Sequence, residues 1–175
     1  KYINQIAFSG AEEFVNKYKD SDAKNSIIGH FGLGFYSSFM VSKQVEIITK
    51  SQKANSTAVK WTCDGSPNYT IQETTKKTKG TDIILHIDED SKEFLEENRL
   101  SEILNRYCKF LPVQVKFGTK KIFVDDPKGK KDDKGDIKQI EKVVDNIINN
   151  TNPAWTKTPQ DLNDEDYSNF YRELY

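Results

Sequence analysis

Three glycines within six positions, at Gly29, Gly32 and Gly34, are the feature that most constrains how this 175-residue chain can fold. The residues that follow, from Phe35 to Val41, carry large apolar side chains at helical spacing. Glycines let the backbone approach another group closely, and the amide N–H groups at the start of a helix attract negative charge. The pattern predicts a loop, a glycine turn and then a helix with a buried face.

The glycine spacing does not match the two common nucleotide-binding motifs. Its order, GxxGxG, differs from the GxGxxG of dinucleotide-binding folds, and no predicted strand directly precedes it. Gly29 and Gly34 have the separation of a P-loop, but Phe35 and Tyr36 stand where that loop needs Lys and Ser or Thr. A tight structural turn without a ligand is therefore the alternative to a phosphate-binding loop.

A second Gly-Thr feature favours the phosphate-binding alternative. Gly80 and Thr81 follow a basic run and open a strand-like segment, where glycine leaves room for a flat ring and the hydroxyl can donate and accept. Four such segments, which alternate or are rich in β-branched residues, predict an antiparallel meander. They cover residues 45–50, 58–63, 69–73 and 81–87.

Helices are predicted on both sides of these strands, so the fold class is α+β. Ser9 and Glu12 have capping-box spacing before a short amphipathic helix that reaches Tyr18. A second helical stripe runs from Leu100 to Leu111, where Pro112 ends it. Alternation over residues 113–117 then predicts one more strand.

The character of the chain changes after Gly118. Residues 125–136 contain no apolar side chain except Pro127, which predicts a mixed-charge linker. Residues 137–150 suit a helix by spacing and a strand by β-branching, and both alternatives stay open. Asn163 and Asp166 mark the start of a last helix, which we assign to a second domain.

Charge and cysteine content limit the function classes. Lys and Arg number 26 against 27 Asp and Glu, so a basic nucleic-acid or membrane-binding face is not expected. Cys63 and Cys108 have neither disulfide-framework nor metal-ligand spacing, and we expect no metal site and a reducing, cytoplasmic location. The start at Lys1 is neither a signal peptide nor an initiator methionine, so we expect the chain to begin inside a larger protein.

Several segments together resemble the heat shock protein 90 chaperone family, of the bacterial HtpG type, within the GHKL ATPase superfamily. They are IAFSG at 6–10, IIGHFGLGFYSSFMV at 27–41, KGTDIILHI at 79–87, and Ala154 to Thr156 with the acidic and aromatic run at 164–171. Phe8 stands where the family commonly has lysine, and Asn4 and Gln5 replace a Gly-Thr pair, which puts the usual lid motion in doubt.

The resemblance implies a partial two-layer α/β sandwich of the GHKL (Bergerat) type, a charged linker and the first helix of a second domain. Ser9 and Gly10 would belong to a lid over the nucleotide, and Thr81 would hydrogen-bond the adenine. The glycine loop would contact the triphosphate through its backbone, with Gly29, His30, Phe31, Gly32, Leu33, Gly34 and Phe35 as its members.

The family's water-activating glutamate, magnesium-binding asparagine and adenine-reading aspartate would all lie upstream of this chain. The resemblance therefore implies no catalytic residue here, and a chain that is inactive on its own but is part of a protein binding ATP or ADP with magnesium. The implied domains are the end of an ATP-binding domain at 1–118, a charged linker with a possible last strand or helix at 119–152, and the start of a middle domain at 153–175.

The implied function is an ATP-dependent molecular chaperone of the stress response. ATP binding and hydrolysis would drive lid closure and clamping of a homodimer on partly unfolded client proteins, with no nucleic-acid or membrane partner. Two alternatives remain, namely another GHKL ATPase of the histidine kinase, topoisomerase or MutL type, and a non-enzymatic interaction module with a purely structural glycine loop.

Overall fold

The computed structural model describes residues 3–5, 9–17, 28–125, 127, 129 and 139–175. The chain divides into two compact units, residues 1–100 and 101–175, and each is described by itself. Tyr18, the polar stretch 20–25 and most of the charged linker at 125–136 lie outside the described residues, as does Phe8.

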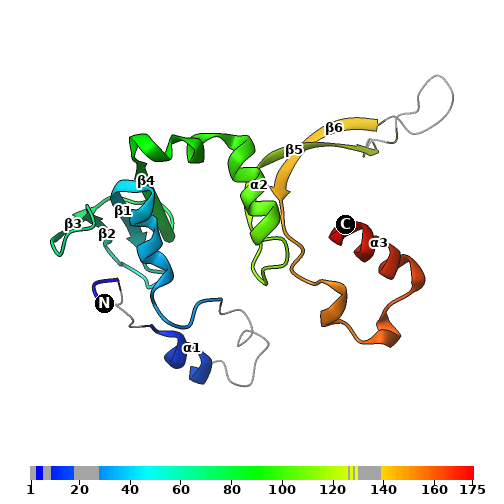
Figure 1. Cartoon of the computed structure of the whole chain (residues 1–175), viewed down its shortest axis with the longest axis horizontal. Helices are drawn as coiled ribbons and strands as arrows, with labels where there is room; N and C mark the ends of the chain where they lie inside the picture. The colour runs from blue at the N-terminus through cyan, green and yellow to red at the C-terminus, as the bar shows by residue number, and fades with distance from the viewer. Residues whose placement is uncertain (1–2, 6–8, 18–27, 126, 128, 130–138) are drawn as a thin grey trace. The chain divides into compact units, whose positions relative to one another are not determined.

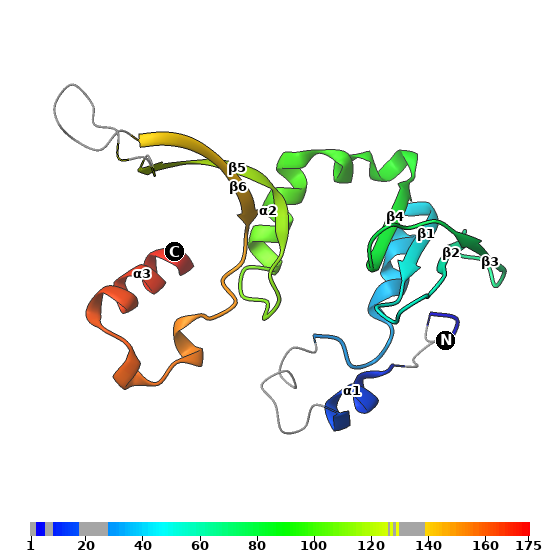
Figure 2. The same cartoon turned by 180° about the vertical axis from the view of Figure 1, so that it is seen from behind.

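The first unit contains one four-stranded antiparallel sheet. Its strands are β1 (Ser42–Lys50), β2 (Ala58–Cys63), β3 (Tyr69–Thr74) and β4 (Gly80–Ile87), close to the predicted segments. The spatial order is β3-β2-β1-β4, so the predicted simple meander is wrong at its last strand (Figures 1 and 2). β4 returns to the free edge of β1, where Ile83 and Leu85 pair with Ile47 and Val45 and extend the same apolar face.

The core of this unit lies on one face of β1 and β2. The register pairs Val45 with Cys63 and Ile47 with Trp61, and all four side chains are buried. A 3-10 helix, η2 (Gly34–Met40), covers them, with Phe35 and Phe39 packed against the cluster. The predicted helix is thus present as a tighter 3-10 helix, but Met40 is 79% exposed and does not belong to its buried face.

The remaining helices of this part of the chain are short. Helix α1 (Ala11–Lys17) begins after Ser9, whose hydroxyl accepts a hydrogen bond from the Ala11 N–H (3.1 Å). A 3-10 segment, η3 (Glu89–Leu95), precedes α2 (Glu97–Tyr107). Helix α2 was predicted to reach Leu111, but it ends at Tyr107, and the Leu111 N–H instead bonds the Cys108 carbonyl in a turn before Pro112.

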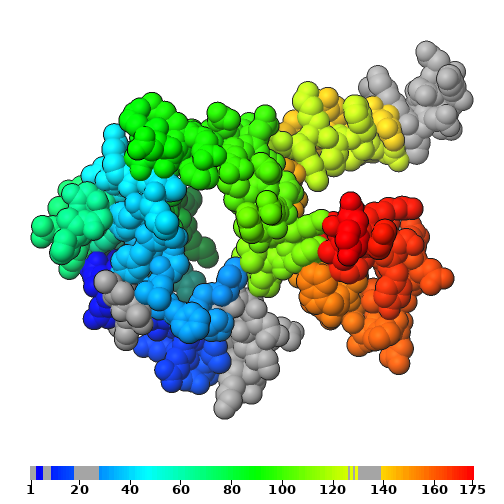
Figure 3. Space-filling model, viewed as in Figure 1, coloured from blue at the N-terminus to red at the C-terminus, as the bar shows by residue number. Residues whose placement is uncertain are grey.

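The second unit contains a long hairpin. Its second strand includes residues 139–147, so most of the segment 137–150, for which helix and strand were both open, forms a strand. β5 (Lys116–Asp125) pairs with β6 (Gln139–Ile147) in antiparallel register. The predicted strand at 113–117 is wrong except at its end. The Asn149 side-chain amide bonds the carbonyls of Leu111 and Val113 and accepts from the Val115 N–H, so it holds that segment as a loop. Most side chains of the hairpin are exposed, and the others are partly buried (Figure 3).

After the hairpin come η4 (Ala154–Thr156), η5 (Pro159–Asp161) and α3 (Asp164–Leu174). The start predicted for α3 is confirmed, because Asn163 and Asp166 form a reciprocal capping box. Trp155 packs edge-on against Phe110 (4.7 Å between centroids) and Phe170 (5.4 Å), which ties η4 and α3 together. Among the described residues, no helix has the length and apolarity that crossing a bilayer requires.

Candidate functional site

The glycine loop and the segment before α1 border one cavity of about 380 Å³. Six of the ten predicted site residues line it, together with Ile3 and Tyr36. These six are Ser9, Gly10, Gly29, Gly32, Gly34 and Phe35. The volume falls within the range of ordinary small-molecule pockets. Two segments that the resemblance placed at one site therefore do lie around one space.

The glycines of this loop meet two separate structural needs. Gly32 has φ +67°, a left-handed conformation that other residues adopt only with strain. A Cβ atom on Gly29 or Gly34 would meet no atom within 4 Å, so a side chain there would project into open space. Gly32 is thus required by the turn, whereas the absence of side chains at Gly29 and Gly34 keeps room for a ligand.

The position of the loop is set by the core beneath it. The Phe35 ring packs edge-on against Trp61 at 5.8 Å between centroids, which fixes the start of η2 on the sheet. The Tyr36 hydroxyl donates to the Ile3 carbonyl (3.0 Å), and the Trp61 indole N–H donates to the Asn4 side chain (2.9 Å). The first hydrogen bond of η2 runs from the Tyr36 N–H to the Leu33 carbonyl (3.1 Å), so the N–H groups of Gly34 and Phe35, which come before it, can donate to a bound anion.

Four predicted site residues do not line this cavity. His30, Phe31 and Leu33 lie in the loop with exposed side chains, which agrees with a contribution through the main chain alone. Thr81 lies on β4 opposite Thr49 of β1, and the two hydroxyl oxygens are 2.8 Å apart. The Thr81 hydroxyl is therefore already partnered, and its proposed contact with a base stays a prediction.

The opposite face of the sheet carries a charged cluster. Glu46 lies between Lys60 (2.5 Å) and His86 (3.0 Å), on the side away from the core. Hydrogen bonds from Lys60 first, and then from His86, lower the pKa of Glu46 below its usual value of 4.5. Within the described part of the chain, no three His, Cys, Asp or Glu side chains are grouped to hold a metal ion. The cluster is an ion-pair network on the sheet.

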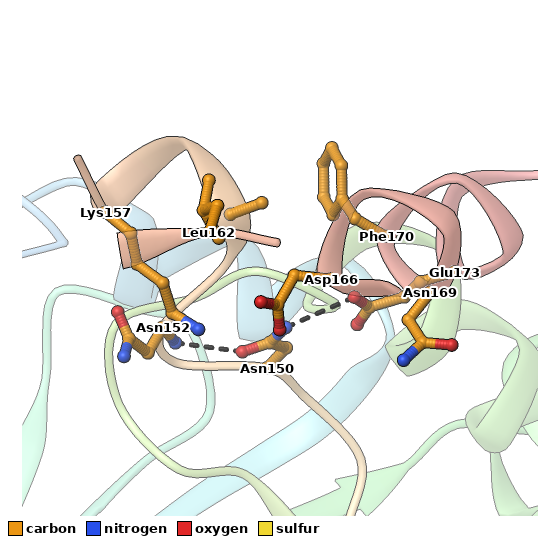
Figure 4. Close-up of a pocket in the computed structure, with 9 residues that line it drawn as sticks. Asn150, Asn152, Lys157, Leu162, Asp166, Asn169, Phe170 and Glu173 are labelled. Carbon is orange, nitrogen blue, oxygen red and sulfur yellow. Dashed lines mark hydrogen bonds between the residues drawn. The ribbon is translucent and has the colours of Figure 1, made fainter. Parts of the chain in front are cut away.

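A separate cavity of about 280 Å³ lies in the second unit, between the segment after β6 and α3 (Figure 4). The Asn150 side chain donates to Glu173 (3.2 Å) and accepts from the Asn152 N–H (2.9 Å). Lys157 and Asp166 complete a wall of amides and opposite charges. No sequence motif signalled this cavity, because its residues come from an irregular segment and one side of a helix.

Comparisons with known proteins agree in pointing to one family. The family model described as Hsp90 protein matches residues 119–175. The "Chaperone protein HtpG" of Bacteroides fragilis is 61% identical over 175 residues, which is all of this chain and 24% of the relative. The protein of the same name from Porphyromonas gingivalis is 55% identical over the same span, and that of Vibrio vulnificus is 37% identical over 99% of this chain.

The chain spans about a quarter of the length of the curated relatives that it matches. The alignment with the Bacteroides protein includes every residue of this chain, so it extends over the glycine loop, the sheet, the hairpin and α3. The comparisons therefore concern only the matching quarter of these relatives, and the cavities described above lie within that quarter.

Proposed function

Because the chain belongs to the Hsp90 family, in its bacterial HtpG branch, we propose that it forms part of an ATP-dependent molecular chaperone. The observation that carries this proposal is the cavity between the Ser9-Gly10 segment and the glycine loop. In this proposal the complete protein binds and hydrolyses ATP, and partly unfolded proteins are its clients. It acts as a homodimer in the cytoplasm and binds neither nucleic acid nor membrane.

The residues present fit a nucleoside triphosphate. Gly29 and Gly34 leave open the space that side chains would fill, and the backbone of Gly34 and Phe35 at the start of η2 borders the same space. The positive end of a helix favours the negative charge of phosphate oxygens. Ser9 and Gly10 close the other side of the cavity, as a lid segment would, and Thr81 is proposed to face the adenine.

Magnesium and catalysis are assigned to other parts of the complete protein. Among the described residues, no three Asp, Glu, His or Cys side chains lie close enough together to hold a metal ion, and the resemblance places the magnesium ligand and the water-activating glutamate upstream. Bound magnesium would neutralise charge on the phosphates. The residues of this chain bind and orient the nucleotide, and the chain alone is proposed to be inactive.

We assign residues 1–118 to the end of a GHKL-type (Bergerat) ATP-binding domain, 119–152 to a charged linker segment and 153–175 to the start of a middle domain. The exposed apolar side chains of Ile83 (55% exposed) and Ile71 (56%) support a larger first domain, since such a sheet face is normally covered. The histidine kinase, topoisomerase and MutL alternatives gain no support from the relatives, which are named as chaperones.

Calorimetric titration of ATP and ADP, with and without magnesium, tests the proposal on this chain and on the complete protein. We expect the complete protein to bind and Gly34→Val to abolish binding, because the new side chain occupies the cavity. Met40→Val is the matched control, since Met40 lies on the same 3-10 helix with its side chain in solvent. Unchanged ATP binding in Gly34→Val would refute the phosphate-binding role of the loop, whereas absence of ATP binding by the complete protein would favour the interaction-module alternative.

A further inference from the structure

A third cavity, of about 460 Å³, lies at one end of the four-stranded sheet. β1 ends there at Lys50, β2 begins at Ala58, and β3 ends at Thr74, because neighbouring antiparallel strands bring such ends together. We call this cavity the lysine pocket, and its functional groups are those of Lys50, Lys76, Lys77, Thr57, Thr74 and Thr75. It shares no lining residue with the cavity at the glycine loop.

Two of the three lysines are held in place by the fold. The Lys50 ammonium donates to the Lys76 carbonyl (3.0 Å), and the Lys76 ammonium forms an ion pair with Asp82. The Lys76 side chain is only 13% exposed, so this lysine is largely covered by the fold where it lines the pocket. Lys77 is exposed and forms no hydrogen bond or ion pair with the part of the chain that the structure describes.

The balance of charge and donors favours an anion. Three lysines line the pocket, and among the described residues no Asp or Glu does. Within that part of the chain, the one carboxylate paired with these lysines is that of Asp82, which contacts Lys76. The hydroxyls of Thr57, Thr74 and Thr75 have no partner among the described residues, whereas that of Ser56 already donates to the Ser51 carbonyl (2.9 Å). Hydroxyl and ammonium donors around one space suit a compact group with several acceptor oxygens.

We propose that the lysine pocket binds a small phosphate-bearing anion, independently of the nucleotide site at the glycine loop. The volume exceeds what one phosphate needs, so the chemistry points to two or more linked phosphates. Lys50 and Lys76 are placed before binding, which lowers the entropy cost, and Lys77 closes on the ligand from solvent. The anion also offsets the repulsion among the three ammonium groups.

Hydrogen exchange of the complete protein, measured with and without tripolyphosphate, tests this inference. We expect saturable protection of the peptides that cover residues 50–58 and 74–80, and loss of affinity as salt increases. Lys77→Glu should weaken binding roughly tenfold, the scale of one charged hydrogen bond. Lys43→Glu is the matched control, since Lys43 is an exposed lysine near the opposite end of β1 and should bind as the unmodified protein does.

Three results would overturn the proposal: absence of protection at saturating tripolyphosphate, equal weakening by Lys43→Glu, or protection by a Glu-rich peptide instead. Should Lys77→Glu lower the melting temperature, the isosteric Thr57→Val takes its place, with an expected loss of a few fold. The Gly34→Val protein separates the two sites. It should lose ATP binding and keep tripolyphosphate protection at the lysine pocket, whereas loss of both would mean that the anion binds at the glycine loop.

Discussion

The four-stranded sheet and the β5–β6 hairpin are built from similar residues, yet they differ sharply in burial. Val45 of β1 is fully buried, whereas Phe123 of β5 is 68% exposed and Val143 of β6 is 58% exposed. Both regions have antiparallel ladders. The sheet also has a second layer, since η2 packs Phe35 and Phe39 against it. Strand pairing alone leaves apolar side chains in water, and the covering layer is what makes a core.

The largest expected effect comes from removing the ring that joins these two layers. Trp61→Ala should lower the free energy of unfolding by about 3 to 5 kcal/mol, because Trp61 is buried and contacts Phe35. Phe123→Ala on the hairpin is the matched control and should change it by about 0.5 kcal/mol or less. Urea unfolding followed by circular dichroism measures both. Similar losses of unfolding free energy in the two variants would refute the difference in burial between the sheet and the hairpin.

The loop that leads into the hairpin is held by hydrogen bonds of one polar side chain, that of Asn149, and not by a buried core. Asn149→Ala removes three hydrogen bonds to the loop at 111–115 and should cost about 1 to 3 kcal/mol. Amide exchange of residues 111–116 should accelerate, while β1 and β2 stay protected. Asn146→Ala removes one hydrogen bond, to the Phe117 carbonyl, and should have a smaller effect. An equal effect of the two substitutions would contradict the role assigned to Asn149.

The sheet should also lose stability in acid. Since Lys60 and His86 lower the pKa of Glu46 in the folded state, the carboxylate stabilises that state above its usual pKa of 4.5. This contribution disappears as the pH falls from 4.5 through the lowered pKa. Glu46→Gln should remove that part of the pH dependence, and Lys60→Met should reduce it. Thermal melts between pH 6 and pH 3 would show it, and identical slopes in all three proteins would disprove it.

The smallest expected effect is that of a cross-strand ion pair in the hairpin. Lys121 and Glu141 lie 2.9 Å apart but are largely exposed, so their coupling should be about 0.2 to 1 kcal/mol. A double-mutant cycle with alanine at both positions measures it, and added salt should reduce it. A coupling well above this range would show that the hairpin is less solvated than its exposed side chains indicate.

Local pattern predicted most strands and the start of α3, because alternation and caps are local properties. Strand order was not predictable in this way, since β4 joins β1 across the sheet and its register depends on Ile83 and Leu85 meeting Ile47 and Val45. The loop at 111–115 alternates like a strand, but Asn149, 34 residues after Val115, bonds its backbone groups. A contact over that distance leaves no periodic signal.

The candidate sites were also predictable only where their residues form a local motif. The glycine spacing marked the loop, because close backbone approach requires glycine, and the resemblance added Ser9 and Gly10; six of these residues line one cavity. The lysine pocket lacks such a motif, since strand ends that are distant in sequence assemble it. Its basic run at 76–79 was visible, but its neighbours Lys50 and Thr57 depend on the strand order.

The hydrogen bond from the Tyr36 hydroxyl to the Ile3 carbonyl joins residues 33 positions apart. In polymer terms, the segment between them is a closed ring and not a free tail. The entropy of closing a loop grows only with the logarithm of its length, and doubling the length adds about 0.6 kcal/mol. The entropic cost of joining the two ends of this segment therefore depends only weakly on how many residues lie between them.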